Sequence, residues 1–448
     1  MSDFSREFAR RIRRAGVVGA GGAGFPSYVK ASGAADTAVV NGAECEPLLQ
    51  KDQELLARHG DEVLTGLELL MRAVGAKAGI VAVKEKHAAL VAKLEAAVKG
   101  RPGISVKRLG DFYPAGDEFT LVHEATGRLI PPGGLPGQVG VVVNNVETLY
   151  NMARADRSPV TDTFLTVTGA VKKPCTLRLP VGTAMSEALA LAGGPTVRDP
   201  AVLDGGAMMG RVETDFSKPL TKTSAGLIVL PAAHPLVRRK GAPRSTDDRV
   251  GKSACDQCSL CTELCPRYLL GYDVQPHRVM RGLLFSRGDR KTWNPWALLC
   301  CECQLCTLYS CPEGLAPGKV CGSAKRDLAE QKVAWKGSAL DAGRPVRRHS
   351  MYAFRKTPVS QLMKRLGLCD YKADAPLLET PFEPASVRIL LKQHVGVPAV
   401  PTVKVGDRVE RGAVIGEVPE EKLGVPVHAS VSGVVGVVGD YVEIRRSA

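Results

Sequence analysis

The sequence predicts a multidomain α/β protein, and three observations support this prediction. The chain has 448 residues, of which 44% are hydrophobic, and this length suggests roughly three domains. In its first third, apolar runs that predict strands alternate with stretches that predict helices. Nine of the 13 cysteines lie in two compact runs between residues 255 and 311, and eight of these nine follow a repeated spacing. The chain should therefore begin with an α/β domain, and a cysteine-rich domain should follow later.

The expected strands of the first domain end in polar residues. They are TAVVNGAECEP (37–47), KAGIVAVKEKH (77–87) and GVVVNNVETL (140–149), with a helix expected over 87–100. Ligands of open α/β sheets bind at the carboxyl ends of strands, so these polar residues are candidate ligand groups. The loop GAGGAGFP (19–26) satisfies G-x-G-x-x-G but lacks the preceding strand that a Rossmann fingerprint requires.

The two cysteine runs have the spacing of iron–sulfur ligands. CDQCSLCTELCP follows the C-x2-C-x2-C-x3-C-P pattern of bacterial ferredoxins, and CCECQLCTLYSCP repeats it with one extra residue in the last gap. Three thiolates from one tight loop can bind three corners of a cube. The predicted ligands are Cys255, Cys258, Cys261, Cys265, Cys300, Cys303, Cys306 and Cys311. Cys301 competes with Cys300 to open the second run, and only Cys300 keeps the two-residue spacing to Cys303.

Disulfides and structural zinc fit these runs less well. Adjacent C-x-x-C pairs are more typical of metal or redox sites, and zinc usually takes two separated pairs. By analogy with two-cluster ferredoxins, the last cysteine of each run should bind the other run's cluster. The first cluster would use Cys255, Cys258, Cys261 and Cys311, and the second Cys300, Cys303, Cys306 and Cys265. We expect Cys45, Cys175, Cys321 and Cys369 to be buried inert thiols.

The composition excludes some classes of protein. The formal charge is +14, but no recognised nucleic-acid-binding motif accompanies it, so we expect no nucleic-acid partner. The basic residues cluster at 238–252 and 344–365, which could be solvated linkers or a docking surface for an acidic partner. No apolar run approaches the ~18–20 residues that span a bilayer.

Four motifs of the first domain carry a resemblance to known flavoproteins. GAGGAGFPSYVK, VVNGAECEP, YPAGDE and VVNNVET occur in the order and spacing of the complex I flavoprotein subunit and the Rnf complex C subunit. The resemblance implies FMN and hydride transfer from NADH. The residues that would lie along the flavin or hold its phosphate and ring edges are Gly21, Gly22, Gly24, Lys30, Asn41, Glu44, Asn144, Asn145 and Thr148. Those that would line the nicotinamide site are Glu46, Tyr113, Asp117 and Glu118. The pattern departs from complex I at Ala43 and Asp117.

The later segments resemble other parts of the same proteins. Residues 164–194 resemble a soluble-ligand-binding β-grasp (SLBB) domain, and residues 397–438 resemble half of a biotinyl/lipoyl-type barrel-sandwich hybrid. The expected division is a complex I flavoprotein-like FMN/NADH domain (1–158), a β-grasp domain (159–237), a helical ferredoxin-like two-cluster domain (238–330), a linker (331–380) and a barrel-sandwich hybrid (381–448).

The order of these domains resembles the cobalamin reductases of propanediol-utilisation microcompartments over nearly the whole chain. That resemblance implies electron transfer from NADH through FMN and two [4Fe–4S] clusters to cobalamin, with no acid–base catalytic residue. It implies coenzyme B12 recycling in 1,2-propanediol degradation, in the cytoplasm inside a bacterial microcompartment. A corrinoid adenosyltransferase and shell proteins would be the partners. Two alternatives stay open: an Rnf C-like subunit feeding a membrane ion pump, and a non-enzymatic electron carrier.

Overall fold

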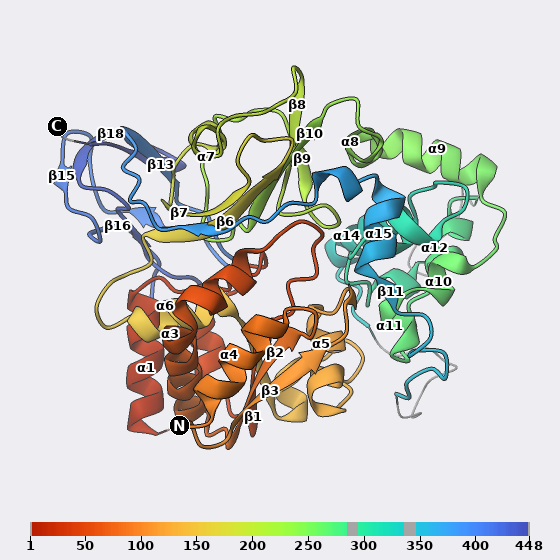
Figure 1. Cartoon of the computed structure of the whole chain (residues 1–448), viewed down its shortest axis with the longest axis horizontal. Coiled ribbons are helices and arrows are strands. Elements are labelled where there is room, and N and C mark those ends of the chain that lie inside the picture. The colour runs from red at the N-terminus through yellow and green to blue at the C-terminus, as the bar shows by residue number, and fades with distance from the viewer. Residues whose placement is uncertain (1, 285–293, 336–345, 447–448) are drawn as a thin grey trace.

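The computed structural model describes residues 2–284, 294–335 and 346–446. The chain forms four folded regions, and the figures show how they are arranged. The first α/β region and the β-grasp region lie one above the other, and the other two regions lie at opposite ends of the molecule (Figure 1). Among the described residues, no helix is both long and apolar enough to cross a membrane.

The first region is a parallel four-stranded sheet with helices on both faces, as the sequence predicts. The strand order is β3-β2-β1-β5. Its strands are β1 (Thr37–Gly42), β2 (Ala78–Lys84), β3 (Ile104–Leu109) and β5 (Val141–Asn145). Its helices are α1 (Asp3–Arg14), α2 (Ser27–Ala31), α3 (Lys51–Val74), α4 (Ala88–Val98), α5 (Glu118–Thr126), η1 (Pro136–Val139) and α6 (Val146–Arg154). The short strand β4 (Phe112–Tyr113) lies outside the sheet.

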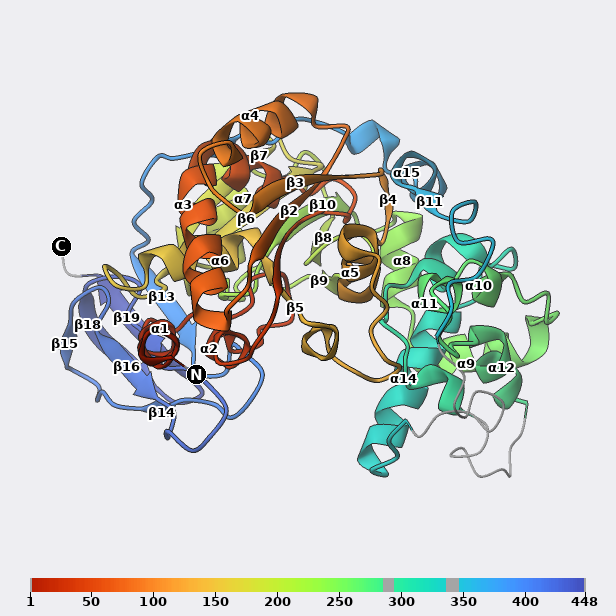
Figure 2. The ribbon, with the colours of Figure 1, turned by 90° about the horizontal axis from the view of Figure 1, so that it is seen from below.

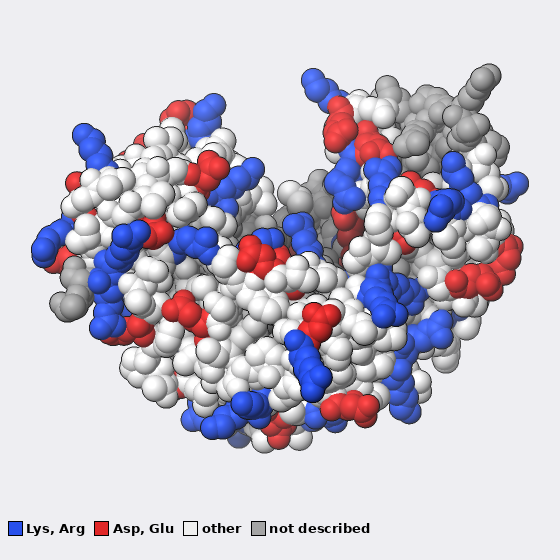
Figure 3. All heavy atoms as spheres, turned by 90° about the horizontal axis from the view of Figure 1, so that it is seen from above, with Lys and Arg blue, Asp and Glu red and all other residues white. Residues whose placement is uncertain are grey.

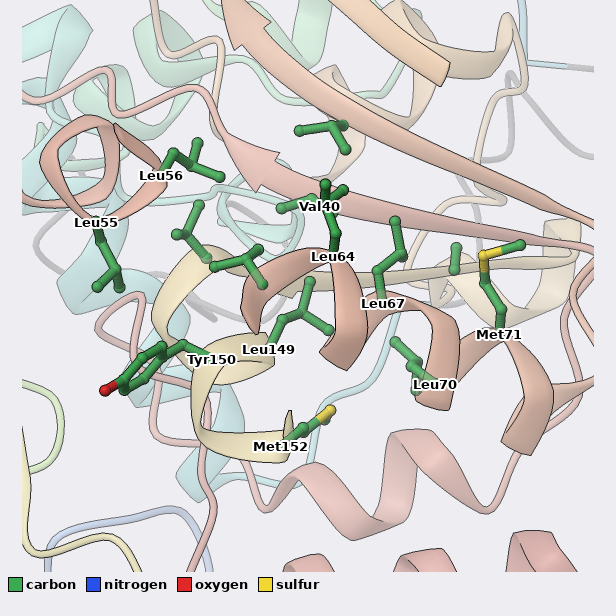
Figure 4. Packing of buried hydrophobic residues seen from close by; sticks show 14 of the residues in the cluster. Val40, Leu55, Leu56, Leu64, Leu67, Leu70, Met71, Leu149, Tyr150 and Met152 are labelled. Carbon is green, nitrogen blue, oxygen red and sulfur yellow. The ribbon is translucent and has the colours of Figure 1, made fainter. Parts of the chain in front are cut away.

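Both faces of this sheet are buried, which explains its continuous apolar runs. On one face Val40 packs with Leu64 and Leu67 of α3 and with Leu149 of α6 (Figure 4). On the other face Val39, Ala82 and Val143 pack against α5. The carboxyl ends of β1 and β5 lie side by side, because Asn41 is paired with Asn145. This edge is where the sequence predicts the flavin ligands.

The β-grasp region follows as a six-stranded sheet in the order β12-β7-β6-β10-β8-β9, in which β12 (Leu377–Leu378) comes from a later segment of the chain. Its elements are β6 (Asp162–Gly169), β7 (Cys175–Pro180), α7 (Met185–Leu191), β8 (Pro200–Asp204), β9 (Arg211–Glu213) and β10 (Gly226–Pro231). The helix α7 packs on this sheet through Met185, Ala188 and Leu189.

The cysteine-rich region consists of short helices joined by the two cysteine loops. They are α8 (Pro235–Gly241), α9 (Arg244–Ala254), α10 (Leu260–Glu263), α11 (Pro266–Leu269), α12 (Pro276–Gly282), η2 (Pro295–Ala297), the π-helical turn η3 (Cys306–Ser310) and α14 (Pro317–Glu330). The extra residue of the second cysteine run lies in η3, where a π-turn accommodates one more residue than an α-turn.

The segment expected to be a linker carries ordered elements. They are β11 (Thr357–Pro358), α15 (Val359–Leu366), η4 (Cys369–Tyr371) and β12 (Leu377–Leu378). The strand β11 pairs with β4 of the first region, and β12 pairs with β7 of the β-grasp sheet. Within the described residues, this segment therefore pairs with two other regions, and its helix α15 also packs against η3 of the cysteine-rich region. The exact domain boundaries remain a prediction.

The last region is a two-sheet β-structure. Its sheets have the orders β13-β19-β18-β15 and β14-β16-β17. The strands are β13 (Ser386–Leu390), β14 (Val400–Pro401), β15 (Arg408–Val409), β16 (Val414–Glu417), β17 (Val427–His428), β18 (Gly433–Val438) and β19 (Tyr441–Arg446). Side chains from both sheets form one small core that includes Ile389, Ile415 and Ile444. This is the barrel-sandwich architecture that the sequence predicts.

Candidate functional site

The glycine-rich loop is held open beside the sheet edge. The Gly24 amide donates to the Gly19 carbonyl (3.1 Å), and the Ala20 amide donates to Thr148 Oγ1 (3.0 Å), so Thr148 anchors the loop. Gly22 has a φ of +101°, which favours glycine, and a Cβ at this position would meet nothing within 4 Å. The loop therefore offers exposed backbone next to empty space.

Two other regions form the wall behind this loop. A Cβ on Gly24 would contact Thr223 of the β-grasp region and His394 of the barrel-sandwich region. The Val395 amide donates to the Gly24 carbonyl (2.9 Å). Thr223, His394 and Val395 carry no local motif, so sequence reasoning could not have found their place beside the loop.

The edge of the sheet supplies one amide that lacks a protein partner. Asn144 is 4% exposed, and its Nδ2 has no hydrogen-bond partner among the described residues. In contrast, Asn41 Nδ2 donates to the Gly116 carbonyl (2.9 Å), and Lys30 Nζ donates to Glu118 Oε1 (3.1 Å) and the Val143 carbonyl (2.9 Å). Among the described sheet-edge candidates, Asn144 is the one whose amide donor is left over for a ligand, because an unpaired buried donor is costly.

Two further candidates serve helix N-termini. The Asn145 side chain caps α6 by accepting from the Glu147 amide (2.9 Å), and its Nδ2 donates to Asp52 (2.6 Å). The Glu44 carboxylate accepts from the Asp52 amide (3.1 Å) at the start of α3. Burial, and then the neighbouring Asp52 carboxylate, raise the pKa of Glu44 to about 8. These two side chains stabilise the edge that carries the site.

The expected nicotinamide residues already have protein partners. The Glu46 carboxylate accepts from the backbone amides of Met208 (2.8 Å) and Met209 (2.9 Å) in the β-grasp region. The buried Tyr113 hydroxyl donates to the Cys303 carbonyl (2.8 Å) in the second cysteine loop.

Asp117 is also occupied. Its Oδ1 accepts from Arg267 Nη2 (2.7 Å), and its Oδ2 caps α5 by accepting from the Thr120 amide (3.1 Å). Glu46, Tyr113 and Asp117 thus join the first region to other regions. Arg267 was not among the sequence candidates, although it follows the Cys265-Pro266 pair directly.

The residues present fit FMN. A flat ring system needs close approach to backbone, which Gly22 permits, and a buried acceptor would satisfy Asn144 Nδ2. The sheet edge and the loop place these two features on neighbouring elements. The individual flavin and nicotinamide contacts remain predictions.

The two cysteine loops share one backbone pattern. In each loop, the residues directly before and after the middle cysteine have positive φ: Gln257 (62°) and Ser259 (64°) in the first, Glu302 (57°) and Gln304 (61°) in the second. This pattern aligns Cys300 with Cys255 and places Cys301 opposite Asp256. The Glu302 amide also donates to Cys300 Sγ (3.3 Å). The geometry therefore favours Cys300 over Cys301 as the first ligand of the second run.

The neighbours of two thiols agree with the interleaved ligand sets of the ferredoxin analogy, which remain a prediction. Burial, and then the thiols of Cys311, Cys255 and Cys258, raise the pKa of Cys261 to about 12. For Cys306, burial raises the pKa first, followed by the thiols of Cys300 and Cys265 and then by the thiols of Cys261 and Cys301. Cys311 thus lies with the first run, and Cys265 with the second.

The two cysteine runs have the spacing of cluster ligands and not the two separated pairs that structural zinc usually takes. Among the residues that the structure describes, no three His, Cys, Asp or Glu side chains converge on one ion position. A [4Fe–4S] cluster binds each thiolate to a different iron, so its ligands stand apart around a cube.

The remaining cysteines differ partly from expectation. Cys175 and Cys321 are buried, whereas Cys45 is half-buried and Cys369 is exposed. Cys369 opens the short η4 turn, which has no buried residue, so the expectation of burial is wrong there. Cys321 is not isolated either, because its thiol hydrogen-bonds the Cys300 thiol.

Many residues of the two basic stretches hold regions together. Lys240 Nζ donates to the Met208 carbonyl (2.7 Å), and Lys356 Nζ pairs with Glu124 of α5 (2.7 Å). On the face shown in Figure 3, basic side chains are interspersed with acidic ones. The contacts of Lys240 and Lys356 show that the two stretches are not simple solvated linkers.

Comparison with known families matches each region separately. The family described as Nuo51 FMN-binding domain matches residues 12–154, and the SLBB domain matches 164–212. The 4Fe-4S dicluster domain matches residues 254–316, and the RnfC barrel sandwich hybrid domain matches 371–448. The fold and site thus define a multidomain oxidoreductase with an FMN-binding domain and a 4Fe-4S dicluster domain.

Full-length relatives make the assignment specific. The chain is 43% identical over 427 residues to "Cobalamin reductase PduS" of Citrobacter freundii. This alignment covers 95% of this chain and 93% of the relative. It is 42% identical to the protein of the same name from Salmonella typhimurium, over 98% of this chain and 96% of the relative. The chain belongs to the PduS cobalamin reductase family.

More distant relatives match only part of the chain. One component of a proton-translocating ferredoxin:NAD(+) oxidoreductase complex from Clostridium ljungdahlii is 32% identical over 59% of this chain and 56% of that component. Among solved structures, an NAD+-reducing [NiFe]-hydrogenase in the air-oxidized state aligns with a TM-score of 0.50 at 22% identity. That alignment covers 76% of this chain and 66% of the hydrogenase chain, and it shows a shared fold.

Proposed function

We propose that this chain is an NADH-dependent cobalamin reductase. It would take electrons from NADH at FMN and deliver them through two [4Fe–4S] clusters to a corrinoid. When bound, FMN converts a two-electron hydride donor into single electrons, which iron–sulfur clusters can carry. The choice of a corrinoid as the electron acceptor rests on the full-length resemblance to the two PduS proteins. The relative from the ferredoxin:NAD(+) oxidoreductase complex aligns with only part of the chain.

One structural observation carries the electron-transfer part of this proposal. The second cysteine loop lies directly against the flavin-binding region, because the Tyr113 hydroxyl donates to the Cys303 carbonyl (2.8 Å). Tyr113 is 2% exposed, so the contact excludes water. Buried contact between a flavin domain and a cluster loop is what a continuous electron path requires.

The chain's own residues hold and orient the cofactors. Gly21, Gly22 and Gly24 would lie along the flavin, with Lys30, Asn41, Glu44, Asn144, Asn145 and Thr148 forming the rest of its pocket. The eight cysteines at 255, 258, 261, 265, 300, 303, 306 and 311 would bind the two clusters. Of the four expected nicotinamide residues, Glu118 is the one whose polar partner, Lys30, also belongs to the flavin-binding region. No side chain needs to act as an acid or a base.

The biological setting follows from the same family. We propose recycling of coenzyme B12 during 1,2-propanediol degradation, with a corrinoid adenosyltransferase as partner. Residence inside a bacterial microcompartment, in contact with shell proteins, is part of this proposal.

A rapid-mixing experiment on anaerobically purified protein tests the proposal. NADH should bleach the flavin, then reduce the clusters, and then convert added cob(III)alamin to cob(II)alamin. Flavin-free protein should lose every response to NADH while dithionite still reduces both clusters. Cluster reduction by NADH in flavin-free protein would contradict the proposal, and so would an inert flavin in the complete protein. In the latter case, the chain would be a carrier only.

A further inference from the structure

Among the described residues, two polar contacts between the flavin-binding region and the cysteine-rich region lie beside the second thiol set. Tyr113 contacts the carbonyl of Cys303, and Asp117 pairs with Arg267, two residues after Cys265. Cys303 and Cys265 both belong to the second set. The helix α11, which carries Arg267, accordingly packs against α5, which Asp117 caps.

Arg267 is held in this contact by two partners. Its guanidinium lies 3.6 Å from the centre of the Phe119 ring and 2.7 Å from Asp117 Oδ1, and the residue is only 9% exposed. A buried ion pair contributes little net stability, but losing one partner leaves the other charge uncompensated. Such a pair fixes geometry, because the planar guanidinium must satisfy the carboxylate and the ring together.

The first set lies on the other side of the region. Cys258 is exposed, and its neighbour Leu260 is 38% exposed. The helices α9 and α12 lie outward from α5 and the flavin-binding sheet (Figure 2). The second set therefore lies beside the contacts with the flavin region, whereas the first set reaches solvent at Cys258.

We infer that Arg267 and Tyr113 are positioning residues that make the second thiol set the arrival side for electrons, and that the Cys258 edge of the first set is where they leave for the corrinoid. This inference rests on the proposed function and adds direction to it. Electrons that leave the reduced flavin would reach the corrinoid one at a time, so two transfers balance one NADH and no further oxidant is needed. Asp117 then serves the cluster region rather than nicotinamide.

Cysteine variants test the order of the two sets. In Cys303→Ser, NADH should still bleach the flavin but should fail to reduce the remaining cluster, which dithionite reduces. In Cys258→Ser, NADH should reduce the remaining cluster at the wild-type rate, while cob(III)alamin reduction is lost. Freeze-quench EPR identifies the reduced cluster in each variant. The opposite pattern would overturn the inference, whereas a flavin that NADH does not bleach in wild type would contradict only the proposed function.

A second variant keeps the inference testable if loss of a cluster disturbs folding. Arg267→Met keeps much of the length of the side chain and removes its charge. Because small misplacements of reacting groups have large kinetic effects, we expect cluster reduction by NADH to slow by about 10-fold to 100-fold. Flavin bleaching and dithionite reduction should be unchanged, and Arg267→Lys should restore part of the rate.

Arg278→Met is the matched control. Arg278 also lies over an aromatic ring of the same region, 4.8 Å from the centre of Trp296, but it is exposed. Its replacement should leave the rate of cluster reduction unchanged. If NADH reduces the clusters equally slowly in both variants, or if dithionite also reduces them more slowly, Arg267 has a general structural role and the inference is contradicted.

Discussion

The two halves of the expected flavin–nicotinamide site differ in what fills them. Along the glycine-rich loop, Gly22 faces open space and Asn144 keeps an unpaired amide. In the nicotinamide half, Glu46, Tyr113 and Asp117 each bond another region of the chain. Residues that match a family motif equally well can therefore differ in whether they are free to bind a ligand. Some of them instead form contacts with the domains that surround the shared fold.

The largest expected effect concerns the open half. Gly22→Val should weaken FMN binding by about 100-fold, or about 2.7 kcal/mol, because the added side chain fills the open space and disfavours a φ of +101°. Flavin content after purification and FMN titration would measure it. Gly75→Val is the matched control: Gly75 ends α3 with a φ of +77°, and its Cβ would also meet nothing within 4 Å. If both variants lose FMN equally, backbone strain and not the site explains the result.

A second prediction compares two neighbouring asparagines. Asn144→Ala should weaken FMN binding by about 10-fold, the effect of losing one well-made hydrogen bond to a buried group. It should change the stability of the flavin-free protein less than Asn145→Ala, which removes the cap of α6 and costs about 1 kcal/mol. FMN titration and thermal unfolding of both variants measure the two effects. If Asn144→Ala lowers the stability of the flavin-free protein as much as Asn145→Ala does, the prediction that the Asn144 amide binds FMN would be contradicted.

The smallest effect concerns the wall behind the glycine-rich loop. Lys222 Nζ is buried there, donating to the carbonyls of Gly16 (2.8 Å) and Pro426 (3.3 Å), and burial lowers its pKa to about 7. Above pH 7 the folded protein releases this proton while the unfolded chain holds it up to about pH 10.4. The contribution of Lys222 to the free energy of unfolding should therefore rise with pH in this window, by about 1 kcal/mol per pH unit.

Lys222→Met should remove that part of the pH dependence. Thermal unfolding between pH 7 and 9 measures the free energy of unfolding of wild type and variant. The contributions of the other titrating groups cancel in the difference between the two proteins. Lys218→Met serves as control, because Lys218 is an exposed lysine of the same region, paired with Glu213. A constant difference between wild type and Lys222→Met across this range would show that the buried amine keeps its ordinary pKa.

The sequence predicted those features that depend on local spacing. The parallel sheet follows from apolar runs with polar ends, and the shared loop geometry follows from two-residue cysteine spacing. Both kinds of pattern lie within a few tens of residues. The choice between Cys300 and Cys301 also followed from spacing, and the positive φ of Glu302 and Gln304 gives it a structural reason.

The features that the sequence could not predict are contacts between distant segments. The partners of Glu46 are backbone amides, which carry no sequence signal. The partner of Asp117 is an arginine 150 positions away, in another region. The segment 331–380 looked like a linker because its strands have only two residues each, too few for a recognisable alternation.

The hydrogen bond between the Val395 amide and the Gly24 carbonyl bears on how the protein is made. The glycine-rich loop leaves the ribosome well before His394 and Val395, which back it and lie far later in the chain. A nascent chain would therefore carry an incomplete flavin pocket until the barrel-sandwich region has folded. Cofactor insertion would then be a late event in biogenesis, and chains interrupted before residue 395 would accumulate without flavin.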